Sequence, residues 1–77
     1  MTLRWSSIDD GKSYLGRDAE GWQRALVERH DRPRMLPRWT CSVGGRRNVG
    51  GDYSTAEEAR QAAERAWRET APRAPGR

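Results

Sequence analysis

The chain contains one histidine and one cysteine, the side chains that most often supply a base and a nucleophile. His30 and Cys41 lie on opposite sides of a proline-containing segment, and no nucleophile signature surrounds either residue. Cys41 is expected on the inward side of a strand, together with Trp39 and Val43. This position favours a small buried thiol. The sequence therefore predicts neither a cysteine–histidine dyad nor a zinc site, which would need a Cys/His cluster.

Other chemistry-bearing residues are better explained by turns. Asp9 and Asp10 directly precede Gly11, which is typical of a hairpin turn rather than of an acid/base pair. The glycine pairs at 44–45 and 50–51 lack the spacing, the lysine and the strand-to-helix context of a phosphate-binding loop. Since nucleophile, base and oxyanion donor cannot all be supplied, we expect a protein that is not an enzyme and that uses no cofactor or metal.

Arginine carries most of the functional chemistry in this chain, which has 14 arginines, one lysine and a net charge of +4. Residues 29–47 contain six arginines and one acid, Asp31, whereas residues 1–28 and 54–70 each hold one more acid than base. Guanidinium groups bind phosphate in bidentate geometry and can read guanine edges. This clustering predicts a nucleic acid, or a nucleoprotein or protein complex, as the partner.

The candidate binding residues lie in or beside a strand predicted at 38–43, whose Arg38, Thr40 and Ser42 should face away from the core. Together they would form one basic face. The predicted set is Arg32, Arg34, Arg38, Thr40, Arg46 and Arg47. A plainer interpretation stays open, in which the arginines only solvate the exposed side of a one-sided sheet.

The element with the strongest pattern is a helix over residues 54–70. Its apolar residues recur at the spacing of one helix face. They are Ala59, Ala62, Ala63, Ala66 and Trp67. Two overlapping capping boxes, Ser54–Glu57 and Thr55–Glu58, predict its start, and Pro72 predicts its end. Such an alanine stripe is expected to pack closely across a sheet.

Short strands should precede this helix. Period-two alternation predicts one over residues 3–8, a hairpin turn at 9–12 and a return strand over 13–15 that stops at Gly16. Residues 22–30 fit a strand or a helix, and we favour the strand. Two prolines predict a loop over 31–37. After the 38–43 strand, residues 44–47 should turn and 48–49 should start another strand, with a bulge or close backbone approach at 50–51.

The expected fold class is α+β, with an antiparallel sheet of three to five short strands packed on one C-terminal α-helix. We expect one small domain over residues 1–71 and a flexible tail over 72–77. Only 34% of the residues are hydrophobic and none is Phe, so the core should be thin and homodimerisation stays open. With no apolar span and no signal peptide, we expect no membrane partner and a cytoplasmic location.

A family resemblance covers residues 38–68. It rests on these features in chain order: Trp39, Val43, a glycine-rich hairpin with Arg46 and Arg47, Val49–Gly50, Tyr53 and the helix start Ser54–Ala59. This order resembles the three-stranded-sheet-plus-helix DNA-binding domains of plant ethylene-response factors and the arm-binding domains of phage integrases. In those families the helix braces the sheet and sheet residues enter the major groove. The resemblance implies DNA binding, with Arg38, Thr40, Arg46 and Arg47 facing the DNA.

A second hypothesis comes from size and composition. A small, tryptophan-rich chain without catalytic parts is also similar to the small phage or mobile-element inhibitors, anti-CRISPR proteins among them, that block a host defence complex. Exposed aromatic residues and arginine supply most of the energy at such interfaces. Tryptophans exposed beyond the needs of the core would favour this inhibitor, whereas a sheet face of Arg, Thr and Ser would favour DNA binding.

Overall fold

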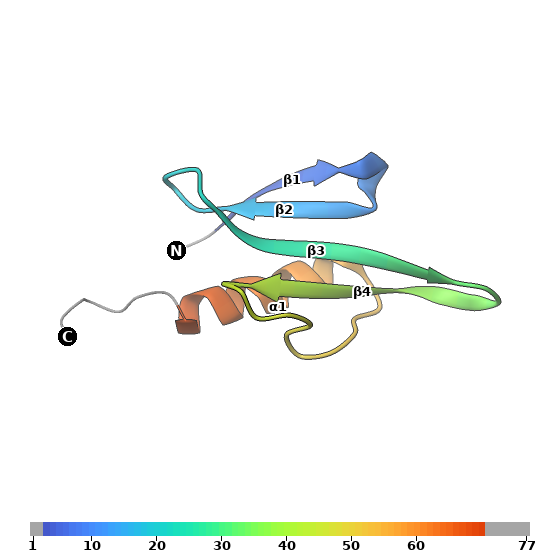
Figure 1. Ribbon diagram of the computed structural model, residues 1–77. Helices are drawn as coiled ribbons and strands as arrows, with labels where there is room; N and C mark the ends of the chain where they lie inside the picture. The colour runs from blue at the N-terminus through green and yellow to red at the C-terminus, as the bar shows by residue number, and fades with distance from the viewer. Residues whose placement is uncertain (1–2, 71–77) are drawn as a thin grey trace.

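The computed structural model describes residues 3–70, so the predicted tail at 72–77 lies outside the described residues. The elements in chain order are β1 (Arg4–Ile8), the short 3-10 helix η1 (Asp9–Gly11), β2 (Ser13–Arg17), β3 (Gln23–Arg32), β4 (Met35–Val43) and α1 (Ala56–Thr70). The four strands form one antiparallel sheet in the order β1-β2-β3-β4. Helix α1 covers one face and packs on β3 and β4 (Figure 1). The predicted α+β architecture is confirmed.

The core is a thin layer between α1 and the two strands beneath it. Cys41 and Val43 of β4 are 0% and 1% exposed, which confirms the inward side predicted for this strand. Ala25 and Val27 of β3 lie beside them. The predicted helix stripe, Ala59, Ala62, Ala63, Ala66 and Trp67, is buried along its whole length. Because alanine side chains are small, the helix lies close to the sheet and Trp67 supplies most of the apolar volume on its side.

The start of α1 is capped by one of the two predicted boxes. The Thr55 hydroxyl accepts a hydrogen bond from the backbone N–H of Glu58 at 3.1 Å. The Glu58 carboxylate in turn accepts one from the backbone N–H of Ser54, also at 3.1 Å. The Ser54 hydroxyl accepts a bond from Arg38 of β4 at 3.4 Å instead of capping. The helix start is therefore tied to the sheet by a side chain of β4.

The predicted β1–β2 hairpin is confirmed, although β2 was expected to stop at Gly16. It continues to Arg17, and Gly16 is buried. The reason is a close contact, since a Cβ added to Gly16 would lie 3.1 Å from the ring of Trp5 on β1. The four-residue turn starts at Asp9, which takes a positive φ of 55° as does Asp10 at 54°. It is therefore longer than the two-residue turn typical of Asp-Gly.

The strand interpretation of residues 22–30 is confirmed by β3, but the loop predicted over 31–37 is wrong. Strands β3 and β4 continue through this segment to a tight turn at Pro33 and Arg34, where Arg32 pairs with Met35. The backbone tolerates both prolines of this segment because of where they lie. Pro33 lies in the turn, and Pro37 lies where β4 has one more residue than β3 between the pairs at 30/38 and 32/35. Proline is tolerated at turns and bulges.

The strand expected to start at 48–49 is not formed. Residues 44–53 instead return along the outer edge of β4 as a loop held by isolated bridges, Val43 with Arg46 and Trp39 with Tyr53. The close approach predicted at 50–51 is confirmed, because a side chain on Gly50 would collide with the Tyr53 hydroxyl. That hydroxyl donates a hydrogen bond to the carbonyl of Val49 at 3.0 Å. This loop shields one edge of the sheet.

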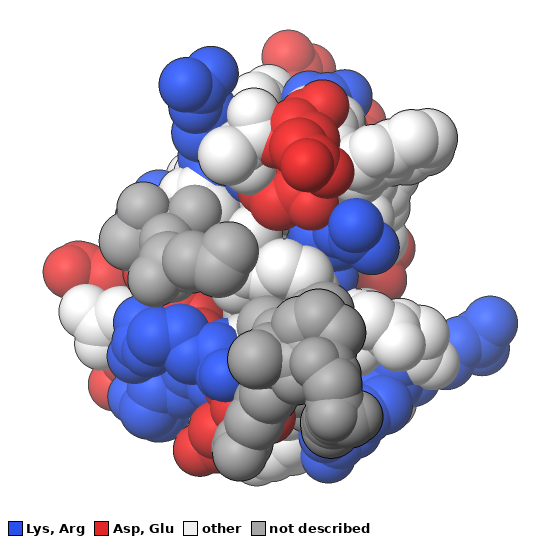
Figure 2. All heavy atoms as spheres, turned by 90° about the vertical axis from the view of Figure 1, so that its left-hand side faces the viewer, with Lys and Arg blue, Asp and Glu red and all other residues white. Residues whose placement is uncertain are grey.

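The end of the molecule opposite the β3–β4 turn has a mixed surface. Figure 2 shows basic and acidic side chains interspersed there. Within residues 3–70, no helix combines the length and the apolar character that crossing a membrane requires.

Candidate nucleic-acid interface

The β3–β4 hairpin extends beyond the rest of the sheet. Strand β2 pairs with β3 as far as Ser13 and Glu28, and the Arg29 N–H donates to the carbonyl of Lys12 at 2.9 Å. From His30 to the turn, β3 pairs only with β4 among residues 3–70. We call residues 30–38 the arm. Figure 1 shows the arm projecting from the sheet on the side away from the β2–β3 turn.

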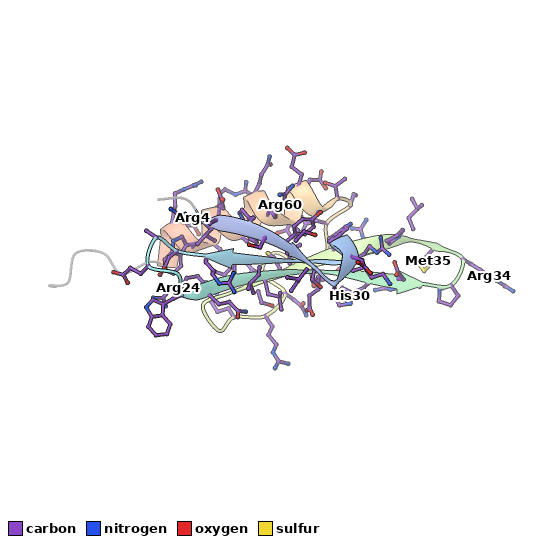
Figure 3. All side chains as sticks on the ribbon, turned by 90° about the horizontal axis from the view of Figure 1, so that it is seen from above. Arg4, Arg24, His30, Arg34, Met35 and Arg60 are labelled. Atoms are coloured by element: carbon purple, nitrogen blue, oxygen red, sulfur yellow. The ribbon has the colours of Figure 1, made fainter. Side chains whose placement is uncertain are left out.

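The arm carries a basic tip. Every residue from 31 to 37 is exposed. Arg32 and Arg34 lie at the turn, and Arg34 points outward from the end of the molecule (Figure 3). The one acid of the arm, Asp31, forms an ion pair with Arg29, with Oδ1 3.0 Å from Nε. The two tip guanidinium groups therefore face solvent with little opposing charge on the arm itself.

The tip also exposes large apolar side chains. Leu36 is 83% exposed and Met35 is 59% exposed. Pro33 and Pro37 flank them in the sequence. Within residues 3–70 the other large apolar side chains that are exposed are Ile8 and Trp22, which lie outside the arm. Cationic and apolar groups are thus interleaved on a single protruding hairpin.

Two predicted site residues stand at the base of the arm and have partners inside the protein. Arg38 is half-buried, and its Nε lies 4.0 Å from a carboxylate oxygen of Asp52. Thr40 lies on the predicted face, away from α1, but it is only 8% exposed. Its hydroxyl is 2.9 Å from the Nε2 atom of His30 on the neighbouring strand. Thr40 therefore fixes the base of the arm rather than presenting its hydroxyl to a ligand.

The remaining two predicted residues lie at the other end of β4. Arg46 and Arg47 are exposed in the loop that follows Val43. A nine-residue strand such as β4 is about 27 Å long, so these arginines are far from the tip. The structure brings Arg32 and Arg34 together but separates them from Arg46 and Arg47. The six predicted residues do not form one continuous basic face.

The open face of the sheet is not uniformly polar. Paired positions near its centre hold Leu15 and Leu26, and Glu28 is exposed on the same face. A hollow on this face is lined by Leu26, Glu28, His30 and Arg47, among others. The uniform surface of Arg, Thr and Ser that would favour DNA reading by the sheet face is therefore not observed.

The tryptophans bear on the protein-inhibitor hypothesis. Trp67 is buried, and Trp5 and Trp39 are half-buried against the core. Only Trp22, in the β2–β3 turn, is mostly exposed, at 65%. One tryptophan is thus available for a partner, at a site remote from the arm.

The single cysteine and histidine do not meet. Cys41 faces α1, and its Sγ donates to the carbonyl of Val49 at 3.5 Å, whereas His30 contacts Thr40 on the opposite face. Burial raises the pKa of the Cys41 thiol, which opposes formation of the nucleophilic thiolate. This confirms the buried thiol predicted for Cys41.

Comparison of the chain with protein-family models, with curated proteins and with solved structures found no match. Within residues 3–70, no group of three or more His, Cys, Asp or Glu residues is placed to hold a metal ion. The geometry of the arm is accordingly the main guide to function. Sequence reasoning missed Met35 and Leu36 as candidate site residues because it placed them in a loop. Asp31 and Pro37, which are depleted in strands, lie on either side of the turn, so no local sequence signal marked this hairpin.

Proposed function

We propose that this protein is a non-catalytic DNA-binding module that engages duplex DNA through the arm. The observation that carries the proposal is the free two-stranded ribbon with Arg32 and Arg34 exposed at its turn. Compared with the sequence hypothesis, the proposed contact surface moves from the sheet face to the hairpin. Arg38 lies at the base of the same ribbon, where its guanidinium group is 4.0 Å from the Asp52 carboxylate.

The dimensions of the arm suit a DNA groove. Paired strands lie about 4.8 Å apart, and the major groove of B-DNA, about 12 Å wide, admits a two-stranded ribbon. Known β-ribbon readers enter either groove. A narrow turn with guanidinium groups at its end can follow the groove floor while the flanking arginines contact phosphates.

The charge distribution also supports an orientation in which the arm faces the DNA. Affinity for duplex DNA comes largely from neutralised phosphates and the counterions they release. The arm presents arginines with one acid, which is already paired, whereas the opposite end of the molecule mixes both signs (Figure 2). A duplex should therefore approach the arm first. We infer a cytoplasmic location, where such a module would meet DNA.

The proposal is tested by removing equal charge from the two arginine pairs. Binding to a labelled duplex is followed by fluorescence anisotropy between about 50 and 200 mM salt. Arg32→Gln with Arg34→Gln should weaken binding about tenfold or more and reduce the salt slope by about two contacts. Arg46→Gln with Arg47→Gln makes the same charge change at the far end of β4 and should have a smaller effect. Equal losses from both pairs would contradict binding by the arm, and no binding at about 50 mM salt would reject DNA as the partner.

A second candidate function, inhibition of a host defence complex by a small phage or mobile-element protein, is favoured by the exposure of Trp22. Exposed tryptophan is enriched among the residues that dominate protein interfaces. Pull-down from the source cell with and without nuclease separates the two functions. A protein partner that survives nuclease treatment and is lost with Trp22→Ala would support the inhibitor and displace the DNA-binding proposal.

A further inference from the structure

The arm tip exposes two large apolar side chains in a protein that has few of them. The core is built mainly from alanine and valine, while Leu36 and Met35 remain in solvent at 83% and 59% exposure. Apolar side chains lose favourable free energy when left in water. Leu36 and Met35 are adjacent in the sequence and lie beside a two-residue turn. They give the end of a basic ribbon two exposed apolar side chains.

The backbone restrains this apolar end. Pro33 and Pro37 each have a fixed φ, which reduces the number of conformations that the tip can adopt. Arg34 has a φ of 65°, in the left-handed region that glycine or asparagine usually occupies in turns. A restrained tip loses little conformational entropy when it binds, so its side chains are preorganised for insertion.

The chemistry of the tip selects its partner. Proteins that kink DNA insert Leu, Met, Pro or similar wedges between base steps from the minor groove. The negative potential of a narrow minor groove attracts arginine. In the arm, Arg34 directly precedes the apolar pair in the sequence, and Arg32 pairs with Met35 across the turn. Charge would bring the tip to the groove, and the base stack would then shelter the apolar side chains from water.

Building on the proposed function, we infer that Leu36, supported by Met35, is a wedge that enters a base step from the minor groove and bends the duplex. The arginines supply attraction and the apolar pair supplies the distortion. Flexible pyrimidine–purine steps are the preferred sites because they unstack most easily.

Binding and bending are measured on the same samples. A duplex of about 20 base pairs carries a donor and an acceptor dye at its two ends, and anisotropy gives the affinity. The full chain should increase energy transfer as it binds. Leu36→Ser with Met35→Ser should abolish that increase, with the salt slope unchanged because every arginine is retained. Ile8→Ser, which changes an exposed apolar residue outside the arm, should bend DNA like the parent chain.

A second readout uses DNA that is easier to unstack at one position. A duplex with one unpaired base at its centre should bind the parent chain about tenfold more tightly than the intact duplex, because the distortion costs less. The Leu36→Ser, Met35→Ser variant should lose this preference. Binding without bending, or equal bending by parent and variant, would overturn the wedge while leaving DNA binding by the arm intact. No binding to either duplex at about 50 mM salt would overturn both proposals.

Discussion

The indole Nε1 of Trp5 donates a hydrogen bond of 2.8 Å to the carboxylate of Glu64, and the two residues are 59 positions apart in the chain. Trp5 lies on the edge strand β1 and Glu64 on α1, so this bond joins the first strand to the last helix. The same tryptophan ring covers Gly16 on β2. The bond therefore links α1 to a strand outside the β3–β4 pair on which the helix packs.

Removing the carboxylate should weaken this closure. We expect Glu64→Ala to lower the free energy of unfolding by about 1 to 2 kcal/mol, because a part-buried bond to a charged acceptor is lost. Urea unfolding measures the change. Glu69→Ala, an exposed position in the last turn of α1, should change stability by less than about 0.5 kcal/mol. Similar effects from both substitutions would mean that the Trp5 bond contributes little.

Two tryptophans should differ sharply in their importance for folding. Trp67 is 7% exposed and lies beneath the guanidinium group of Arg24, 5.4 Å from the ring centroid. Trp67→Ala should cost about 3 to 5 kcal/mol, enough to unfold much of a small domain. Trp22→Ala, at the 65% exposed position, removes the same atoms and should leave the melting temperature almost unchanged. Thermal unfolding followed by circular dichroism compares them. A folded Trp67→Ala protein would show that α1 does not depend on this anchor.

Stability and DNA affinity should change in opposite directions at Arg34. Its φ of 65° costs a non-glycine residue about 1 kcal/mol. Arg34→Gly should therefore stabilise the fold by up to about 1 kcal/mol while weakening DNA binding through the lost charge. Arg46→Gly removes the same charge at a residue whose φ is not positive, so it should not stabilise. Urea unfolding and anisotropy on both variants separate these effects, and a destabilised Arg34→Gly protein would contradict the assigned turn.

Acid should release the β2–β3 turn by protonating Asp18. Its carboxylate accepts hydrogen bonds from Arg24 Nε at 2.8 Å and from the backbone N–H groups of Glu20 and Trp22. The side-chain bond from Arg24 is the main cause that lowers the pKa of Asp18. Ionised Asp18 therefore stabilises the fold at pH values above its unfolded-state pKa of about 3.9. This stabilisation is lost as the pH falls through the lower folded-state pKa. Asp18→Asn should be less stable than the parent at neutral pH, with a difference that narrows in acid. An unchanged acid dependence would contradict this role.

The sequence was sufficient to predict those elements whose hydrophobic pattern extends over many residues. The α1 stripe and the alternation around Cys41 depend on many residues, and both were predicted correctly. The arm was missed because Pro33 and Pro37 are strand-breaking residues by type. They are compatible with strands here only because one lies in the turn and the other at a register shift, and neither position can be recognised before the pairing is known.

The candidate site shows a second limit of sequence reasoning. The excess of arginine between residues 29 and 47 was correctly read as a local feature of the chain, but proximity in sequence did not give proximity in space. Strand β4 places Arg34 and Arg46 at opposite ends. Thr40 was expected to be accessible from its alternation, yet its bond to His30 removes it from the surface. Side-chain pairing across strands of this kind depends on register, which local patterns do not specify.

The arm's backbone pairing has a consequence for how the protein can change. Since strand pairing in the arm involves no other element among residues 3–70, replacement of Leu36 or Arg32 leaves the helix, its cap and the buried layer untouched. Substitutions at these two positions are therefore expected to be almost neutral for folding. A lineage carrying this scaffold can explore new targets by altering a handful of codons, with no need for compensating changes elsewhere.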